Sequence, residues 1–146
     1  MKDVRLRRAR RRDCREILAI LERASLPLDG VRDHLRGFLL AEDAEGTLIG
    51  SIALEFYGET ALLRSAAVVP SHQGSGLGSL LLSRICEIAR EHGVRRLLLL
   101  TTTAEEFFKK RGFHRIEAED VTGPVRASSE FRGACPSTAT CMERIL

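Results

Sequence analysis

The stretch Ala67-Val68-Val69-Pro70-Ser71-His72-Gln73-Gly74-Ser75-Gly76-Leu77-Gly78 joins an apolar strand to an amphipathic helix through a glycine-rich turn. Pro70 ends the strand because it has no N–H to donate to a neighbouring strand. The alternating glycines have no Cβ atoms, so the turn can point its backbone N–H groups toward an anion. The helix that follows adds unpaired N–H groups and the positive end of its dipole. The stretch therefore predicts a nest for a diphosphate.

Alternating glycines also occur in purely structural turns, so the strand, the proline and the helix around them carry the prediction. The turn is not a Walker loop, because no Gly-Lys-Ser/Thr sequence ends it. It also departs from the dinucleotide-binding GxGxxG fingerprint, because Gly78 follows Gly76 after a single residue. These two common nucleotide-binding loops are therefore excluded.

On the N-terminal side of the turn, short strands and helices are expected. A first strand is expected around residues 4–6, and a capping-box pattern of Asp13 and Glu16 opens a helix that continues to Ala24. A second, shorter helix is expected over 31–35. Three extended segments joined by turns then predict an antiparallel meander, over residues 37–42, 47–56 and 60–69.

On the C-terminal side, the helix that opens at Leu77 is expected to end at Gly93. The continuous apolar run 97–100 is typical of a strand covered on both faces. A capping-box pattern at Thr103 opens a further helix. Later strands are expected near residues 113–117 and 141–146.

This order of elements predicts one α/β domain over residues 1–146, with a mixed, mostly antiparallel, twisted sheet flanked by helices. The chain is 44% hydrophobic and 29% charged, which excludes a disordered or fibrous protein. No apolar run approaches the roughly 20 residues that cross a bilayer. The charged N-terminus also lacks the apolar part of a signal peptide. We therefore expect a cytoplasmic protein without a membrane partner.

The formal net charge is +3, and the positive excess is local, since seven arginines crowd the first fifteen residues. These arginines suit either a nucleic-acid-binding patch or the solvated face of a first strand and helix. No aromatic residues interleave with them to stack on bases, which favours the solvated face. No nucleic-acid partner is therefore expected.

The four cysteines contain no CxxC pair and are expected to be free thiols in a reducing compartment. Cys135 and Cys141 lie close in sequence, so binding of a thiophilic ligand stays open. No group of His, Cys and carboxylate residues has metal-ligand spacing, and no metal is expected.

The residues around the glycine-rich turn resemble the GNAT superfamily of acetyltransferases. The signature of that family is Gln or Arg, two residues, Gly, one residue, then Gly or Ala, and it reads here as Gln73, Gly76 and Gly78. The segment 104–113 resembles the second motif of the family, a helix that ends in Gly-Phe. The resemblance covers most of the chain. It implies a GNAT-like fold that binds acetyl-CoA and transfers the acetyl group to an amine.

The resemblance also implies which residues hold acetyl-CoA. Backbone groups of the strand would pair with the pantetheine arm, and the turn with the first helical residues would hold the pyrophosphate. These residues are Ala66, Ala67, Val68, Gln73, Gly74, Ser75, Gly76, Leu77, Gly78 and Ser79. In the second motif, Phe108 stands where many members have a tyrosine, so the acid that protonates the leaving thiolate stays unassigned.

An acceptor amine with a pKa of about 10 is mostly charged at neutral pH, so a general base helps the transfer. Glu55, late in its strand, is the expected catalytic base, and a surface carboxylate is the alternative reading. Arg64 and Ser65 are the expected substrate-binding residues. Arg64 suits a substrate carboxylate or oxyanion, with an ion pair to Glu55 as the alternative.

Three segments resemble a narrower group, the arsenic-resistance N-acetyltransferase branch. They are 62–65, 99–104 and the pair 130–131 with 135–136. This resemblance implies a small-molecule amine as acceptor, such as an amino-acid-like organoarsenical or a related toxic amino acid, and it leaves open whether Cys135 and Cys141 bind arsenic. A non-catalytic coenzyme-A-binding module or sensor is the alternative function, which Phe108 permits. Proteins of the family that this chain resembles commonly form homodimers, so a homodimer is a candidate assembly.

Overall fold

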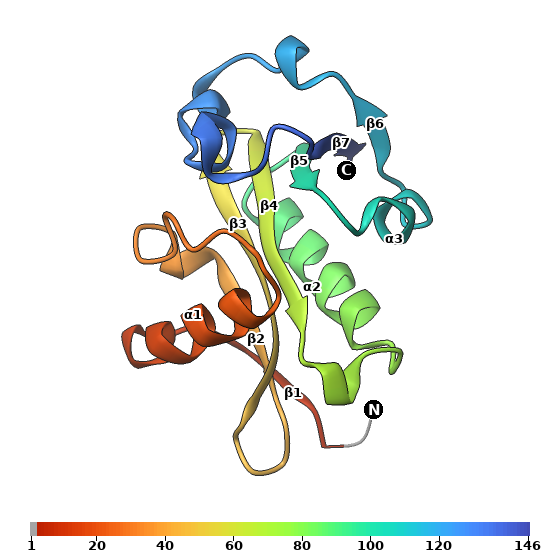
Figure 1. The fold of residues 1–146 in the computed structure, drawn as a ribbon. Helices are drawn as coiled ribbons and strands as arrows, with labels where there is room; N and C mark the ends of the chain where they lie inside the picture. The colour runs from red at the N-terminus through yellow and green to blue at the C-terminus, as the bar shows by residue number, and fades with distance from the viewer. Residues whose placement is uncertain (1–2) are drawn as a thin grey trace.

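The structure is a computed structural model, and it describes residues 3–146. Its centre is a seven-stranded sheet in the order β1-β2-β3-β4-β5-β7-β6 (Figure 1). The strands are β1 (Arg5–Arg8), β2 (Phe38–Glu42), β3 (Leu48–Tyr57), β4 (Thr60–Val68), β5 (Arg96–Thr101), β6 (His114–Ile116) and β7 (Thr140–Ile145). β4 and β5 run parallel, and the other neighbouring pairs run antiparallel. The predicted mixed, mostly antiparallel sheet is confirmed.

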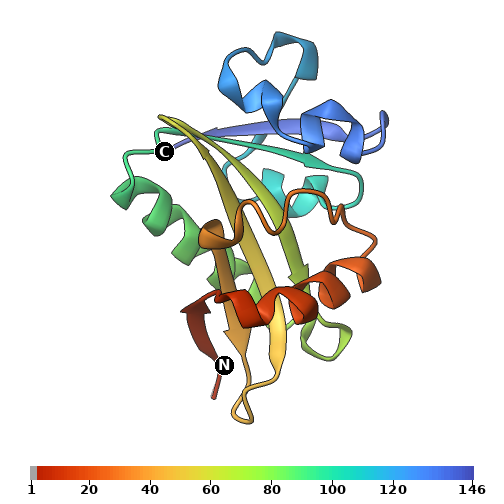
Figure 2. The same cartoon turned by 90° about the vertical axis from the view of Figure 1, so that its left-hand side faces the viewer.

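Helices cover both faces of this sheet. They are α1 (Cys14–Arg23), α2 (Leu77–Glu91) and the short α3 (Glu105–Lys109). Figure 2 shows α1 lying across the sheet on the near side, with α2 on the opposite side. Because successive side chains of a strand point to opposite faces, Leu40 of β2 packs in the α1 cluster and Leu39 in the α2 cluster. Strand β2 is therefore buried on both faces.

Three local predictions are wrong. The expected helix over 31–35 is a series of turns followed by a 3-10 helix over Leu35–Gly37. The side chain of Asp13 does not cap α1, because it accepts the N–H of Arg10 at 2.7 Å instead. Thr103 does not cap α3 either. Ala104 is the N-cap residue, and its N–H already donates to Thr101 Oγ1 at 3.0 Å.

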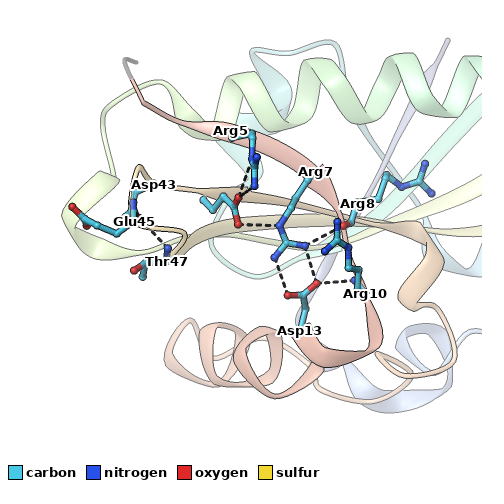
Figure 3. A network of polar contacts seen from close by, with 9 residues as sticks. Arg5, Arg7, Arg8, Arg10, Asp13, Asp43, Glu45 and Thr47 are labelled. Carbon is cyan, nitrogen blue, oxygen red and sulfur yellow. Dashed lines mark hydrogen bonds and ion pairs between the residues drawn. The ribbon is translucent and has the colours of Figure 1, made fainter.

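The arginine-rich start of the chain forms an ion-pair network between β1, β2 and the 3-10 turn Arg11–Asp13 that precedes α1 (Figure 3). The guanidinium of Arg7 donates to both carboxylate oxygens of Asp13 at 2.9 Å, and its Nε donates to Glu42 at 2.9 Å. Arg5 also pairs with Glu42. The hydrogen bond from Arg7 is the main reason why the pKa of Asp13 falls to about 2. The expectation that these arginines form a solvated face is therefore wrong for Arg7, because Arg7 neutralises two buried carboxylates.

Gly37 lies where the chain enters β2, and its backbone approaches β3 closely. A Cβ atom at this position would lie 1.9 Å from the carbonyl oxygen of Leu54. We expect Gly37→Ala to lower the free energy of unfolding by about 1–3 kcal/mol, because the backbone of β2 or β3 must move to accept the methyl group. Urea unfolding followed by circular dichroism measures this loss. An unchanged midpoint would contradict the close contact of these two segments.

Candidate functional site

Strands β4 and β5 pair only over their first residues and then separate. Their pairing ends at Leu62 and Leu98, although both strands continue. On the other edge of β4, the register with β3 shifts so that Ser65 and Ala66 have no partner residues. Ser65 has a φ of 57°, a left-handed conformation that is uncommon for a residue with a Cβ atom. The backbone at Ser65 and Ala66 is therefore released from the regular ladder on both edges.

A groove of about 360 Å³ lies beside this irregular part of β4. Its walls come from β3, β4, α2 and the segment 103–108. Five of the residues expected to bind the cofactor line the groove, namely Ala66, Ala67, Val68, Gln73 and Gly78. A mostly apolar groove that ends at a glycine-rich turn suits a ligand with an apolar arm and an anionic end.

The glycine-rich turn has the geometry expected of an anion nest. Gly74 and Gly76 have φ values of 79° and 88°, which glycine adopts without steric cost. The predicted start of the following helix at Leu77 is confirmed, with Gly76 as the N-cap residue and no side-chain hydrogen bond at the cap. The first N–H groups of α2 therefore keep their capacity to bind an anion.

The other turn residues contact the protein itself. Gln73 Nε2 donates to the carbonyl oxygen of Val68 at 3.0 Å, and the side chain of Leu77 is fully buried. Ser75 Oγ donates to the carbonyl of His72. The side chains of Gln73 and Ser75 thus shape the turn, and Leu77 can offer a ligand only its backbone N–H.

Arg111 is a candidate residue that the sequence analysis missed. Its NH2 and Nε groups donate to Ser79 Oγ at 2.7 and 3.0 Å, so its positive charge lies beside the first turn of α2. Its guanidinium also stacks on the ring of Phe107 at 3.7 Å. Its position just before Gly112-Phe113 in the second motif was the available signal.

A narrower cavity of about 80 Å³ adjoins the groove. The two share Ala66, Thr103, Ala104 and Phe108 as lining residues. The other walls of the narrow cavity include Arg64, Ser65 and Glu130. A water molecule occupies about 30 Å³ in the liquid. The narrow cavity therefore has room for a small group such as an amine and its neighbouring carbon.

A third, outer cavity of about 640 Å³ lies next to the narrow one and shares Leu100 and Glu130 with it. Arg126 and Cys135 also line the outer cavity. A further polar cleft of about 840 Å³ lies beside residues 127–134; it shares Gly133 with the outer cavity and no lining residue with the narrow cavity. The groove, the narrow cavity and the outer cavity thus form a row in which each space borders the next.

Arg64 is fully buried between two carboxylates. Its NH1 group donates to Glu55 Oε2 at 2.7 Å, and its Nε lies 3.4 Å from Glu130 Oε2. Its Nε also donates to Ser65 Oγ at 3.0 Å. The ion pair with Glu55, one of the two readings left open from the sequence, is present in the structure. A substrate carboxylate would have to compete with that pair for Arg64.

Glu55 lies on β3 and lines none of the three spaces in the row. Its Oε1 accepts a hydrogen bond from the Tyr57 hydroxyl at 2.5 Å, and His34 Nε2 lies 3.7 Å away. Burial acts to raise the pKa of Glu55, but hydrogen bonds from Ser128, Tyr57 and Arg64 together lower it. A carboxylate with these partners has little tendency to take up a proton.

Glu130 has the opposite environment. It begins the turn over Glu130–Ala134, is 4% exposed, and borders both the narrow and the outer cavity. Burial raises its pKa to about 7, and the nearby charge of Arg64 offsets part of that effect. In the sequence, Glu130 stands out only as part of the narrower resemblance, because the residue reaches the site from the C-terminal part of the chain.

Phe108 cannot act as the acid, because its phenyl ring has no proton to donate. Its ring is 5% exposed and packs edge-on against Phe107 and Phe113, with centroids 5.1 and 5.4 Å away. Because it lines both the groove and the narrow cavity, an acid at this position would have faced the reacting atoms. The acid stays unassigned.

Residues 5–113 match the family described as the acetyltransferase (GNAT) family. The chain belongs to this family. The matched segment contains the groove and the glycine-rich turn, whereas Glu130 lies beyond it. The predicted GNAT fold is confirmed.

Two curated relatives are named amino-acid acetyltransferase. The one from Aeromonas salmonicida is 36% identical over 81 residues, which cover 54% of this chain and 18% of the relative. The one from Mycobacterium tuberculosis is 32% identical over 96 residues, which cover 64% of this chain and 55% of the relative. The chain thus spans less than two thirds of either relative.

A solved structure with the same fold is N-acetylglutamate synthase from Neisseria gonorrhoeae, in complex with coenzyme A and N-acetyl-glutamate. It superposes with a TM-score of 0.84 at 28% identity, and the match covers 98% of this chain and 35% of that one. Within residues 3–146 of the present protein, no helix is long and apolar enough to cross a membrane. The same residues contain no group of three His, Cys, Asp or Glu side chains that could hold a metal ion.

Proposed function

We propose that this GNAT protein is an acetyl-CoA-dependent N-acetyltransferase that acts on the amine of a small molecule. The observation that supports this most is the groove beside β4, which leads to the glycine-rich turn and the N-terminus of α2. The pantetheine arm would lie along Ala66, Ala67 and Val68. The pyrophosphate would be held by backbone N–H groups of the turn, including that of Gly76.

The thioester carbonyl would lie where the groove meets the narrow cavity. At this point Ser65 and Ala66 have no register partners on β3, and only the carbonyl of Ser65 accepts a side-chain hydrogen bond from that strand, from Ser51 Oγ at 2.7 Å, so the N–H groups of Ser65 and Ala66 are candidates to stabilise a developing oxyanion. The amine of the acceptor would occupy the narrow cavity, and the rest of the acceptor would extend into the outer cavity. Ser65 and Arg64 would shape the narrow cavity in this arrangement.

We propose an amino acid as the acceptor class. The relatives named above support this class, and so does Arg126 in the outer cavity, where a cation suits the acceptor carboxylate. One NH group of Arg126 donates to the carbonyl of Ala118 at 2.7 Å, and its other donors remain for a ligand. An amino-acid-like organoarsenical belongs to the same class and rests on the narrower resemblance alone, since none of the relatives reported above is named for arsenic resistance.

Release of the coenzyme A thiol from acetyl-CoA, measured with a panel of amino acids, tests the function. We expect turnover with at least one amino acid. Arg126→Gln should raise the KM for that acceptor about tenfold, because a hydrogen bond to a charged group contributes roughly 1.5–3 kcal/mol and the residue is exposed. The KM for acetyl-CoA and the reaction of the matching amine without a carboxylate should change little.

Arg132→Gln is the matched control, since Arg132 is also exposed but lines the further polar cleft. Equal effects of the two substitutions would contradict the placement of the acceptor in the outer cavity. Tight binding of acetyl-CoA without turnover of any amine would favour the non-catalytic sensor instead.

A further inference from the structure

The narrow cavity has a single carboxylate among its lining residues, that of Glu130. The cavity also borders the groove, with which it shares Ala66 and Phe108. An amine in the narrow cavity therefore has both the wall shared with the groove and this carboxylate around it. Because Glu130 lines the cavity, an ammonium group inside it shares a space of about 80 Å³ with this residue.

Glu130 also has free hydrogen-bonding capacity on its carboxylate. Its contacts are an ion pair with Arg64 Nε at 3.4 Å and a weak donor, Cys135 Sγ, at 3.6 Å from Oε1. Glu55, in contrast, accepts short hydrogen bonds on both oxygens. An incoming ammonium group can thus donate to Glu130 without breaking a strong contact, whereas it cannot do so at Glu55.

Several charged or titratable groups face Glu130. Arg64 comes from β4, Glu55 from β3, and Cys135 from the same turn, while Arg126 and Glu119 line the outer cavity with it. Burial is the largest influence and raises the pKa of Glu130 to about 7. A general base works best when its pKa lies near the operating pH, because it is then both ionised and basic.

We propose that Glu130 is the catalytic base that takes a proton from the acceptor amine, an assignment that rests on the proposed acetyl transfer. An ammonium N–H proton moves to the Glu130 carboxylate, and the nitrogen lone pair attacks the thioester carbonyl carbon. The C–N bond forms and the C–S bond breaks, so the electron pair leaves on the coenzyme A sulfur. A second N–H proton from the same nitrogen passes to that thiolate, and Glu130 releases its proton to solvent.

The pH dependence of kcat/KM tests this assignment. For an alkylamine acceptor, the wild-type rate should rise with pH through a value near 7 and then level off, because the ionised form of Glu130 is the active one. In Glu130→Gln this rise should move to the pKa of the amine itself, about 9–10. The rate at pH 7.5 should fall by about 10²- to 10⁴-fold.

An alkoxyamine, which is uncharged at pH 7.5, needs no base and serves as the internal comparison. Its reaction should lose less than tenfold in Glu130→Gln. The rise in melting temperature caused by acetyl-CoA should stay at the wild-type value, because Glu130 does not line the groove. Glu87→Gln, on the exposed side of α2, is the matched carboxylate control and should behave as wild type.

A Glu130→Gln variant that keeps the wild-type pH profile, or that loses both reactions equally, would overturn the assignment. A profile that shifts in Glu55→Gln and not in Glu130→Gln would give the role to Glu55. If wild type released no thiol with either amine, the proposed function itself would be wrong. If Glu130→Gln does not fold, NMR can follow the titration of the Glu130 carboxyl group in wild type. That titration should coincide with the rise in kcat/KM. A different titration point would also overturn the assignment.

Discussion

Arg64→Met should lower the free energy of unfolding by about 3–5 kcal/mol near neutral pH. The guanidinium of Arg64 is fully buried and pairs with Glu55 at 2.7 Å and with Glu130 at 3.4 Å. Methionine fills much of the same volume but leaves two buried carboxylates without their cation. The loss therefore comes from uncompensated charge and not from a cavity.

This loss should depend on pH in a defined direction. In wild type the pKa of Glu55 is lowered, so its ionisation stabilises the fold above pH 4.5, its ordinary value, and that contribution disappears as pH falls through the lowered pKa. Without Arg64, the pKa of Glu55 should rise because one of the hydrogen bonds that lower it is lost, and the pKa of Glu130, already raised by burial, should rise further because the charge of Arg64 no longer offsets that effect. Relative to wild type, the variant should then lose stability as pH rises above 4.5, so the difference from wild type is larger at pH 8 than at pH 4.

Urea unfolding at several pH values measures both effects. Arg84→Met is the control, because Arg84 makes only exposed pairs with Glu87 and Glu91 at 3.8 and 3.7 Å and should change stability by less than about 0.5 kcal/mol. If Arg64→Met were as stable as Arg84→Met at pH 8, the prediction would be wrong. Packing of the methionine side chain would then replace the whole contribution of the buried ion pair.

Gly76→Glu should weaken acetyl-CoA binding about hundredfold. The substitution puts a negative charge where the pyrophosphate should lie, and two like charges about 4 Å apart near a protein surface repel by roughly 4 kcal/mol before salt screening. It also forces a residue with a Cβ atom into a φ of 88°. Calorimetric titration with acetyl-CoA, or the shift in melting temperature that it causes, measures the loss.

Gly46→Glu separates the two causes. Gly46 has a similar φ of 82°, lies in the turn between β2 and β3, and would place its Cβ in open space. It therefore has the same backbone strain and the same added charge, at a turn that lines no part of the groove. Normal acetyl-CoA binding by both variants would refute the placement of the pyrophosphate at the glycine-rich turn.

Much of the fold follows from local sequence patterns. Pro70 and the glycines around Gly76 mark a strand end and a helix start within one residue of where they lie, because backbone geometry alone dictates both. Capping was harder to predict. Asp13 has the right spacing to Glu16, but Arg7 and Arg10 bind its carboxylate first, and Arg7 reaches it from the neighbouring strand.

The candidate site could likewise be predicted from the sequence only in part. The segment that lines much of the groove beside β4 was predictable, because Ala66 to Gly78 is one continuous stretch with a recognisable pattern. The acceptor side was not, since Arg64 and Glu130 meet only after the chain has folded back across the sheet. The opposite pKa shifts of Glu55 and Glu130 arise from burial and partner number, which no spacing rule encodes.

The long segment 117–139 arches over one end of the sheet (Figure 1) and carries Glu130 and Arg126. It leaves from β6 and returns through β7, and these two strands pair with each other from His114 with Glu143 to Ile116 with Cys141. Its two ends are therefore held at a fixed separation, like an antibody loop on its framework, and longer or shorter versions cost little in closure entropy. Such an arrangement lets evolution or an engineer reshape the outer cavity, where we propose that the acceptor binds, while the groove beside β4 stays untouched.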